Sequence, residues 1–291
     1  MHYGNFYAAA PVEDLIRYVE DIALWGVNTV VVLLPGPSSY AHGKRTTSPD
    51  APQIPLLKNR TRILLQLVAD IGLSPGVIVV PNQGFDNGTA AHRQGHSPIP
   101  YTPFPDPDHV RGDLGALTCP FKGRDYLLGI MRTELEWYRD IGLDWIVFWP
   151  YDEGGCGCHD DWPWGGKGFP RISSQVATMA RRIYPKLRSI VSTWTFDKPV
   201  VNGSEYDGMD RFIKREVASS TDGTSNFSFA MVDGHGDFPT WPLEYGGGKL
   251  GGLPLLNFPE ISMWGRAPWV AGVRTLCRTD SRASGSKPTA A

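Results

Sequence analysis

A recurring pattern of apolar positions runs along this chain: an amphipathic helical stretch, a glycine or proline, and then a short continuous apolar run. In the first copy, apolar residues three and four apart predict a helix over residues 11–25. After Gly26 comes a β-branched run at residues 28–34. An unbroken apolar run of this length is typical of a strand that is buried on both faces. The pattern therefore predicts a helix followed by a parallel strand.

The pattern recurs three more times. Helical stretches at residues 56–71, 124–141 and 173–184 are followed by apolar runs at residues 75–80, 145–149 and 187–194. Three further strands are predicted at residues 2–7, 226–232 and 253–258. Repeated helix–strand units predict an α/β fold with a parallel sheet.

The long polar loops follow the strands, which places them at one face of the fold. This arrangement is typical of a (β/α)8 TIM barrel, whose active site lies at the carboxyl ends of the strands. A doubly wound sheet is the alternative, but the chain has neither a GxGxxG motif after its first strand nor a P-loop. We therefore expect a barrel.

The end of the chain departs from the pattern. Only residues 259–269 lie between position 258 and the last 22 residues, which leaves little room for the crossover helix that a barrel needs before its eighth strand. The sequence from residue 270 turns basic, small and aperiodic. We expect a catalytic barrel over residues 1–269 with an incomplete or irregular last unit, and an irregular or disordered tail over residues 270–291 that is typical of a truncation. A strand at residues 270–277 is the alternative.

Three carboxylates follow two of the predicted strands. Asp152 and Glu153 come after the fourth strand, and Glu260 comes after the seventh. A glycosidase needs one protonated carboxyl to donate to the leaving oxygen and a second, ionised one to attack or to activate water. In one hypothesis Glu153 is the acid/base and Glu260 the nucleophile. In a second, Glu153 is the acid while Asp152 orients a substrate acetamido group that acts as the internal nucleophile. Asp152 with Glu260 is a third pairing, and a solvated turn is the non-catalytic interpretation of the adjacent acids.

Polar and aromatic residues stand at the other strand ends, where they are candidates for substrate binding. Tryptophan rings offer flat apolar faces on which sugar rings pack, although core packing is the commoner role for any one of them. The candidates are His2, Asn5, Asn82, Trp149, Tyr151, Trp164, Trp194, Asp197, Asp233, His235 and Trp264.

Cysteines suggest a structural zinc site. Cys156 and Cys158 form a CxC pair, and Cys119 precedes them at the end of the preceding loop. His159, Asp160 and Asp161 follow the pair, and any of them, Asp161 included, is a candidate for the fourth ligand. Three thiolates and one further ligand satisfy tetrahedral zinc, although reduced thiols without metal are the simpler interpretation. The chemistry proposed above requires no cofactor.

Charge and composition exclude other classes of partner. The formal net charge of −2 leaves no basic excess for nucleic acid, and no apolar run is long enough for a membrane span. The first residues lack the pattern of a signal peptide, so we expect a soluble protein of unknown compartment and unknown oligomeric state.

Several segments resemble a little-characterised group of bacterial glycoside-hydrolase-like TIM barrels, distantly similar to the β-N-acetylhexosaminidase and α-glucuronidase barrels. The resemblance covers residues 2–269 and is carried by segments 2–7, 13–28, 149–158, 163–165, 192–194 and 257–265. It implies a TIM barrel with carbohydrate chemistry at its mouth. In that group a third cysteine stands at the position of Asp161, and Gln is common at the position of Glu153. The first departure weakens the case for the metal site. The second favours Asp152 and Glu260 over Glu153 as the catalytic residues.

Together these observations predict a glycoside hydrolase that acts on an oligo- or polysaccharide. A substrate-assisted N-acetylhexosaminidase and a non-catalytic carbohydrate-binding barrel are the alternatives.

Overall fold

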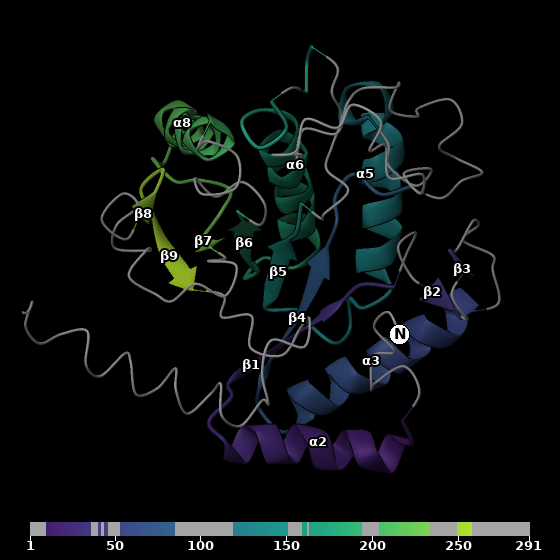
Figure 1. Ribbon diagram of the computed structural model, residues 1–291. Coiled ribbons are helices and arrows are strands. Elements are labelled where there is room, and N and C mark those ends of the chain that lie inside the picture. Colours follow the sequence, from purple (N-terminus) through teal and green to yellow (C-terminus); the bar gives the residue numbers. More distant parts are fainter. Residues whose placement is uncertain are drawn as a thin grey trace, which may run out of the picture.

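The computed structural model describes residues 10–35, 40–41, 44–45, 53–84, 119–150, 159–161, 163–193, 204–232 and 249–257. Within them, a sheet has the strand order β1-β4-β5-β6-β7-β9-β8 (Figure 1). Its strands are β1 (Thr29–Leu33), β4 (Ser74–Val79), β5 (Trp145–Phe148), β6 (Arg188–Ser192), β7 (Phe229–Val232), β8 (Lys249–Leu250) and β9 (Leu253–Asn257). The helices are α2 (Val12–Leu24), α3 (Gln53–Asp70), α5 (Pro120–Glu136), α6 (Gly168–Ile183) and α8 (Ser204–Ser219), and β2 (Tyr40–Ala41) and β3 (Lys44–Arg45) pair separately.

The sheet confirms the predicted α/β class. Strands β1, β4, β5, β6, β7 and β9 pair in parallel in chain order, and a helix lies between each successive pair from β1 to β7. This is the order of consecutive strands in a (β/α)8 barrel. The predicted strand at residues 2–7 and the tail at residues 270–291 lie outside the described residues. Closure of the barrel and the domain boundaries therefore stay predictions.

Glycines end the first helices as the sequence pattern indicates. After α2, Gly26 has a φ of +87° and its N–H donates to the Ala23 carbonyl, while the Val27 N–H donates to the Ile22 carbonyl. This is the Schellman arrangement, which satisfies the last carbonyls of a helix and needs a residue that tolerates positive φ. The chain thereby turns directly from α2 into β1.

The two faces of the sheet bury different side chains. In β5, Ile146 and Phe148 belong to the large core that includes residues of the helices, whereas Trp145 and Val147 belong to a smaller cluster with Ile190 of β6. Alternation along a strand sends successive side chains to opposite faces. Because both faces of the strand are buried, its sequence is a continuous run of apolar residues.

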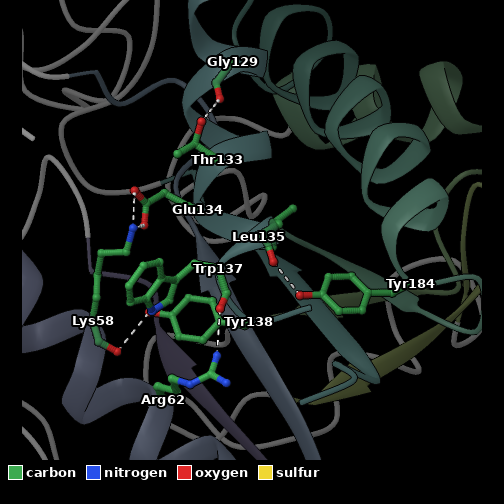
Figure 2. A network of polar contacts seen from close by, with 9 residues as sticks. All are labelled: Lys58, Arg62, Gly129, Thr133, Glu134, Leu135, Trp137, Tyr138 and Tyr184. Carbon is green, nitrogen blue, oxygen red and sulfur yellow. Dashed lines mark hydrogen bonds and ion pairs between the residues drawn. The ribbon is translucent and has the colours of Figure 1, made fainter. Parts of the chain in front are cut away.

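A network of polar contacts joins α3 to the end of α5 (Figure 2). Lys58 Nζ lies 3.2 Å from Glu134 Oε2 and 4.8 Å from the Trp137 ring centroid. Burial raises the pKa of the Glu134 carboxyl, and the Lys58 ammonium lowers it in part. The Tyr184 hydroxyl, just after α6, donates to the Leu135 carbonyl at 2.5 Å. These contacts hold the helix layer together away from the carboxyl ends of the strands.

Helix α8 and strand β8 were not expected from the sequence, whereas β9 lies within the predicted strand at residues 253–258. The signal for α8 was present, since Tyr206, Met209 and Ile213 are buried at helical spacing, but Gly208 and many charges interrupt it. The hairpin turn places Gly251 against α8, where its N–H donates to Asp210 Oδ1 at 2.7 Å. The last described unit is therefore tied to the helix before it.

Replacing Gly251 by alanine is expected to destabilise the protein more than replacing Gly252. Both glycines have positive φ, so alanine costs about 1–3 kcal/mol at either position. A Cβ on Gly251 would also lie 2.4 Å from Ile213 Cβ, whereas nothing lies within 4 Å of a Cβ on Gly252. Overpacking adds about 1–3 kcal/mol at Gly251 alone. Urea unfolding of the two variants measures the difference, and equal losses would contradict this packing.

Candidate functional site

The carboxyl ends of the strands bring several predicted residues to one edge of the sheet. Trp149, immediately after β5, is partly buried and packs against the same cluster as Met231 of β7 and Leu256 of β9. Ser192, the last residue of β6, pairs with Met231 and is buried. Trp149 therefore lies on the sheet face opposite the large helix-packed core, at the end where a barrel has its mouth.

Asn82 lies at the same edge, three residues after β4, and its side chain is fully buried. Neither its amide oxygen nor its amide nitrogen has a hydrogen-bond partner within the described part of the chain. The neighbouring Gln83 is also buried. A buried amide without partners costs about 1–3 kcal/mol, which makes Asn82 a candidate to bind a polar group that lies outside the described residues.

Most of the predicted site residues fall outside the described ranges. These are the candidate catalytic residues Asp152, Glu153 and Glu260, the candidate zinc ligands Cys156 and Cys158, and the candidate binding residues His2, Asn5, Tyr151, Trp194, Asp197, Asp233, His235 and Trp264.

Trp164 does not present its ring at the surface. The side chain is fully buried, and its ring centroid lies 6.0 Å from that of Phe169. A Cβ on Gly168 would lie 2.5 Å from the indole ring, so the chain packs tightly around it. A sugar platform needs an exposed face, and Trp164 instead anchors the turn between β5 and α6.

Asp161 and Cys119 meet although 42 residues separate them. Cys119 Sγ lies 3.3 Å from Asp161 Oδ2, which also accepts a hydrogen bond from the Phe121 N–H at 3.1 Å. The guanidinium of Arg171 pairs with Asp161 Oδ1. Asp161 is fully buried, and these donors satisfy its charge while capping the first turn of α5. The cluster therefore ties the segment after β5 to the helix before it.

The meeting of Cys119 and Asp161 places two of the four predicted zinc ligands side by side. Groups of three or more metal-ligand side chains do not occur among the described residues, and Cys156 and Cys158 lie outside them. Zinc stays a prediction from the sequence. Elemental analysis of purified protein checks it: about one equivalent is expected for a structural site, and less than about a tenth of an equivalent would exclude it.

Glu205 is a buried carboxyl that sequence analysis missed. It lies in the first turn of α8 with a relative exposure of 3%, and neither carboxylate oxygen has a hydrogen-bond partner of normal geometry within the described chain. Burial raises the pKa of Glu205 from 4.5 to about 7, although the N–H groups of Gly165 and Trp164 lower it in part. The helix N-terminus favours a carboxylate by only about 0.3–1 kcal/mol, which is too little to offset burial.

Replacing Glu205 by glutamine is expected to remove a loss of stability between pH 5 and pH 8. Because the pKa in the folded state lies above that in the unfolded chain, the stability that this carboxyl contributes is present below 4.5 and disappears as the pH rises through about 7. The wild type should lose up to about 3 kcal/mol of unfolding free energy relative to the variant over this range. Urea unfolding at both pH values measures the change. The exposed Glu136→Gln control should follow the wild type, and a Glu205→Gln curve parallel to the wild type would refute this origin of the loss.

Comparisons with known proteins match structures only. No family model and no curated protein matches this chain. The pneumococcal exo-β-D-N-acetylglucosaminidase StrH, which has tandem GH20 modules, is 12% identical with a TM-score of 0.48, over 89% of this chain and 64% of that one. A debranching enzyme of Nostoc punctiforme is 16% identical with a TM-score of 0.42, over 75% of this chain and 41% of that one.

The α-L-fucosidase AlfC of Lactobacillus casei is 13% identical with a TM-score of 0.41, over 93% of this chain and 80% of that one. These structural neighbours are glycoside hydrolases at low identity and partial coverage. Likeness at this level assigns neither a substrate nor catalytic residues. Among the described residues, no helix combines the length and the apolar character needed to cross a bilayer.

Proposed function

We propose that this chain is the barrel of a glycoside hydrolase that acts on an oligo- or polysaccharide. One carboxyl after β5, Asp152 or Glu153, works with Glu260 after β9. Asn82 and Trp149 bind the sugar at the same edge, and neither the hydrolysis nor the binding requires a cofactor.

The sheet order carries this proposal. Parallel strands end at the same edge of a sheet, so residues that follow β5 and β9 start from one face of the molecule. Two strands, β6 and β7, lie between them. At roughly 4.8 Å per strand, the two ends are about 14 Å apart along the sheet, and curvature of the sheet shortens the direct path. Acidic side chains are several Å long, so a span of this size is compatible with the separation of about 5–9.5 Å that paired carboxyls need.

The chemistry needs two carboxyls in different protonation states. One carboxyl donates its proton to the leaving oxygen, and the other attacks the sugar or activates a water molecule. A carboxyl separation of about 5–5.5 Å gives retention of configuration, and about 6.5–9.5 Å gives inversion. If the substrate carries a 2-acetamido group, Asp152 and Glu153 instead suffice, because the acetamido oxygen is the nucleophile.

A panel of aryl glycosides tests the proposal. The panel includes both anomers of common hexoses and of their 2-acetamido derivatives, and it follows release of the aryl group together with binding of matched oligosaccharides. We expect turnover of one sugar class, and turnover confined to 2-acetamido sugars would favour substrate assistance. Binding without turnover would replace the hydrolase by a carbohydrate-binding barrel. Absence of both turnover and binding across the panel would overturn both assignments.

A further inference from the structure

Glu205 and the turn of residues 163–166 join two neighbouring helix–strand units. The turn follows β5 and leads into α6, whereas Glu205 begins α8, which follows β6. Helices that follow parallel strands begin near the carboxyl ends of those strands. Contact between the turn and α8 therefore connects the segment after β5, which contains Asp152 and Glu153, to the next unit at the proposed mouth.

The two backbones touch directly one helical turn after Glu205. A Cβ on Gly208 would lie 2.7 Å from Gly166 Cα, and a Cβ on Gly166 would lie 3.1 Å from Gly208 Cα. Residues 205 and 208 are three apart, so they share a face of α8. The face that carries the Glu205 side chain is therefore the face against which the turn packs.

The carboxyl of Glu205 is enclosed by this contact. It is 3% exposed, and its surroundings include the N–H groups of Trp164 and Gly165. No charged side chain of the described residues contributes to the pKa of Glu205. Besides Glu205, the charged residues of the two packed elements are Asp207, Asp210, Arg211, Lys214, Arg215 and Glu216 on α8, and Asp160, Asp161, Lys167 and Arg171 beside the turn. Two of these carboxylates are already paired, Asp161 with Arg171 and Asp210 with Lys214.

A neutral carboxyl fits this enclosure, and a charged one does not. Burial of an ionised carboxylate without a cationic partner costs far more than burial of the protonated acid. Two neighbouring N–H groups recover only part of that cost, because they do not bring a positive charge. On ionisation the carboxylate must gain water, which requires the turn and α8 to separate.

We propose that Glu205 is a proton-dependent positioning residue: its neutral carboxyl keeps the turn of residues 163–166 packed on α8, and its ionisation opens that contact. The turn leads from the segment after β5 into α6, so its opening is expected to lower any activity that depends on the carboxyls of that segment. This last link, to catalysis, rests on the proposed function. The packing step does not.

Fluorine NMR of protein labelled with 5-fluorotryptophan tests the packing step. Among the ten tryptophans, we expect the Trp164 resonance to shift between about pH 5.5 and about pH 8.5, with a midpoint near the Glu205 pKa of about 7. The shift should be absent from Glu205→Gln and present in the exposed control Glu136→Gln. Trp164→Phe assigns the signal, but comparison of the wild type with the two glutamine variants identifies it even if that variant fails to fold.

Activity is read separately. If a substrate is found, kcat of the wild type should fall about tenfold per pH unit above the midpoint, and Glu205→Gln should remove that fall. A pH-dependent shift of the Trp164 resonance in a protein without activity would support the positioning role and overturn the hydrolase. Activity without a pH-dependent shift of the Trp164 resonance would overturn the positioning role and leave the hydrolase assignment intact. A shift that persists in Glu205→Gln would do the same.

Discussion

Replacing Glu260 by glutamine is expected to lower kcat on the responsive glycoside by about 10²–10⁴-fold with little change in KM. Glutamine keeps the shape of the side chain but can neither attack the sugar nor take a proton. An interaction made only in the transition state lowers kcat and kcat/KM together. Steady-state kinetics measures both values. The control is Asp160→Asn, at an exposed carboxyl in the segment after β5, and this variant should retain full kcat.

Three single variants separate the possible pairs of carboxyls. If Glu153 works with Glu260, Glu153→Gln and Glu260→Gln are inactive and Asp152→Asn is active. If Asp152 works with Glu260, Asp152→Asn and Glu260→Gln are inactive. If the substrate supplies its own nucleophile, Glu260→Gln stays active and both adjacent acids are needed. Full activity in all three variants would remove paired-carboxylate catalysis from these residues.

Replacing Asp161 by alanine is expected to lower the free energy of unfolding by about 1–3 kcal/mol. The carboxylate is fully buried and accepts from the Phe121 N–H and the Cys119 thiol while it pairs with Arg171. Its removal leaves the buried Cys119 thiol and the partly buried Phe121 N–H without their acceptor, and the partly exposed Arg171 guanidinium without its partner. Urea unfolding at neutral pH measures the loss.

The neighbouring Asp160 provides a matched control for this prediction. Asp160 is exposed, and Arg171 contacts only its backbone carbonyl, so Asp160→Ala keeps that contact. Its effect should stay within about 0.5 kcal/mol. A loss below about 1 kcal/mol in Asp161→Ala would show that the buried cluster adds little to the fold.

The strands could be predicted because their signal is local. Each apolar run from residues 28–34 to residues 253–258 overlaps a strand of the sheet, in the predicted order. Gly26 and Gly72 follow α2 and α3 and have positive φ. Glycine adopts positive φ without steric cost, so these helix ends could be predicted from the identity of one residue. Helix α8 escaped prediction because charges and Gly208 dilute its apolar face.

The site was less predictable because burial depends on what packs against a residue. Glu205 and Asp207 are two acids in the first turn of the same helix, and nothing in the sequence separates them. Only the turn of residues 163–166, which belongs to another unit, makes Glu205 a buried acid. Trp164 is a second example. Its position in the sequence is compatible with a sugar-binding platform or with a core residue, and its packing against Gly168 and Phe169 shows that it is a core residue.

The sequence by itself therefore determined the class of fold, the order of the strands and the strands after which the candidate carboxyls lie. These follow from periodicity and chain direction, which neighbouring residues set. Tertiary structure alone decided that Asp161 meets Cys119 across 42 residues and that Glu205 is buried beneath the turn after β5. Such contacts depend on how separate units pack, and packing changes the energy of a charge by more than any local preference does.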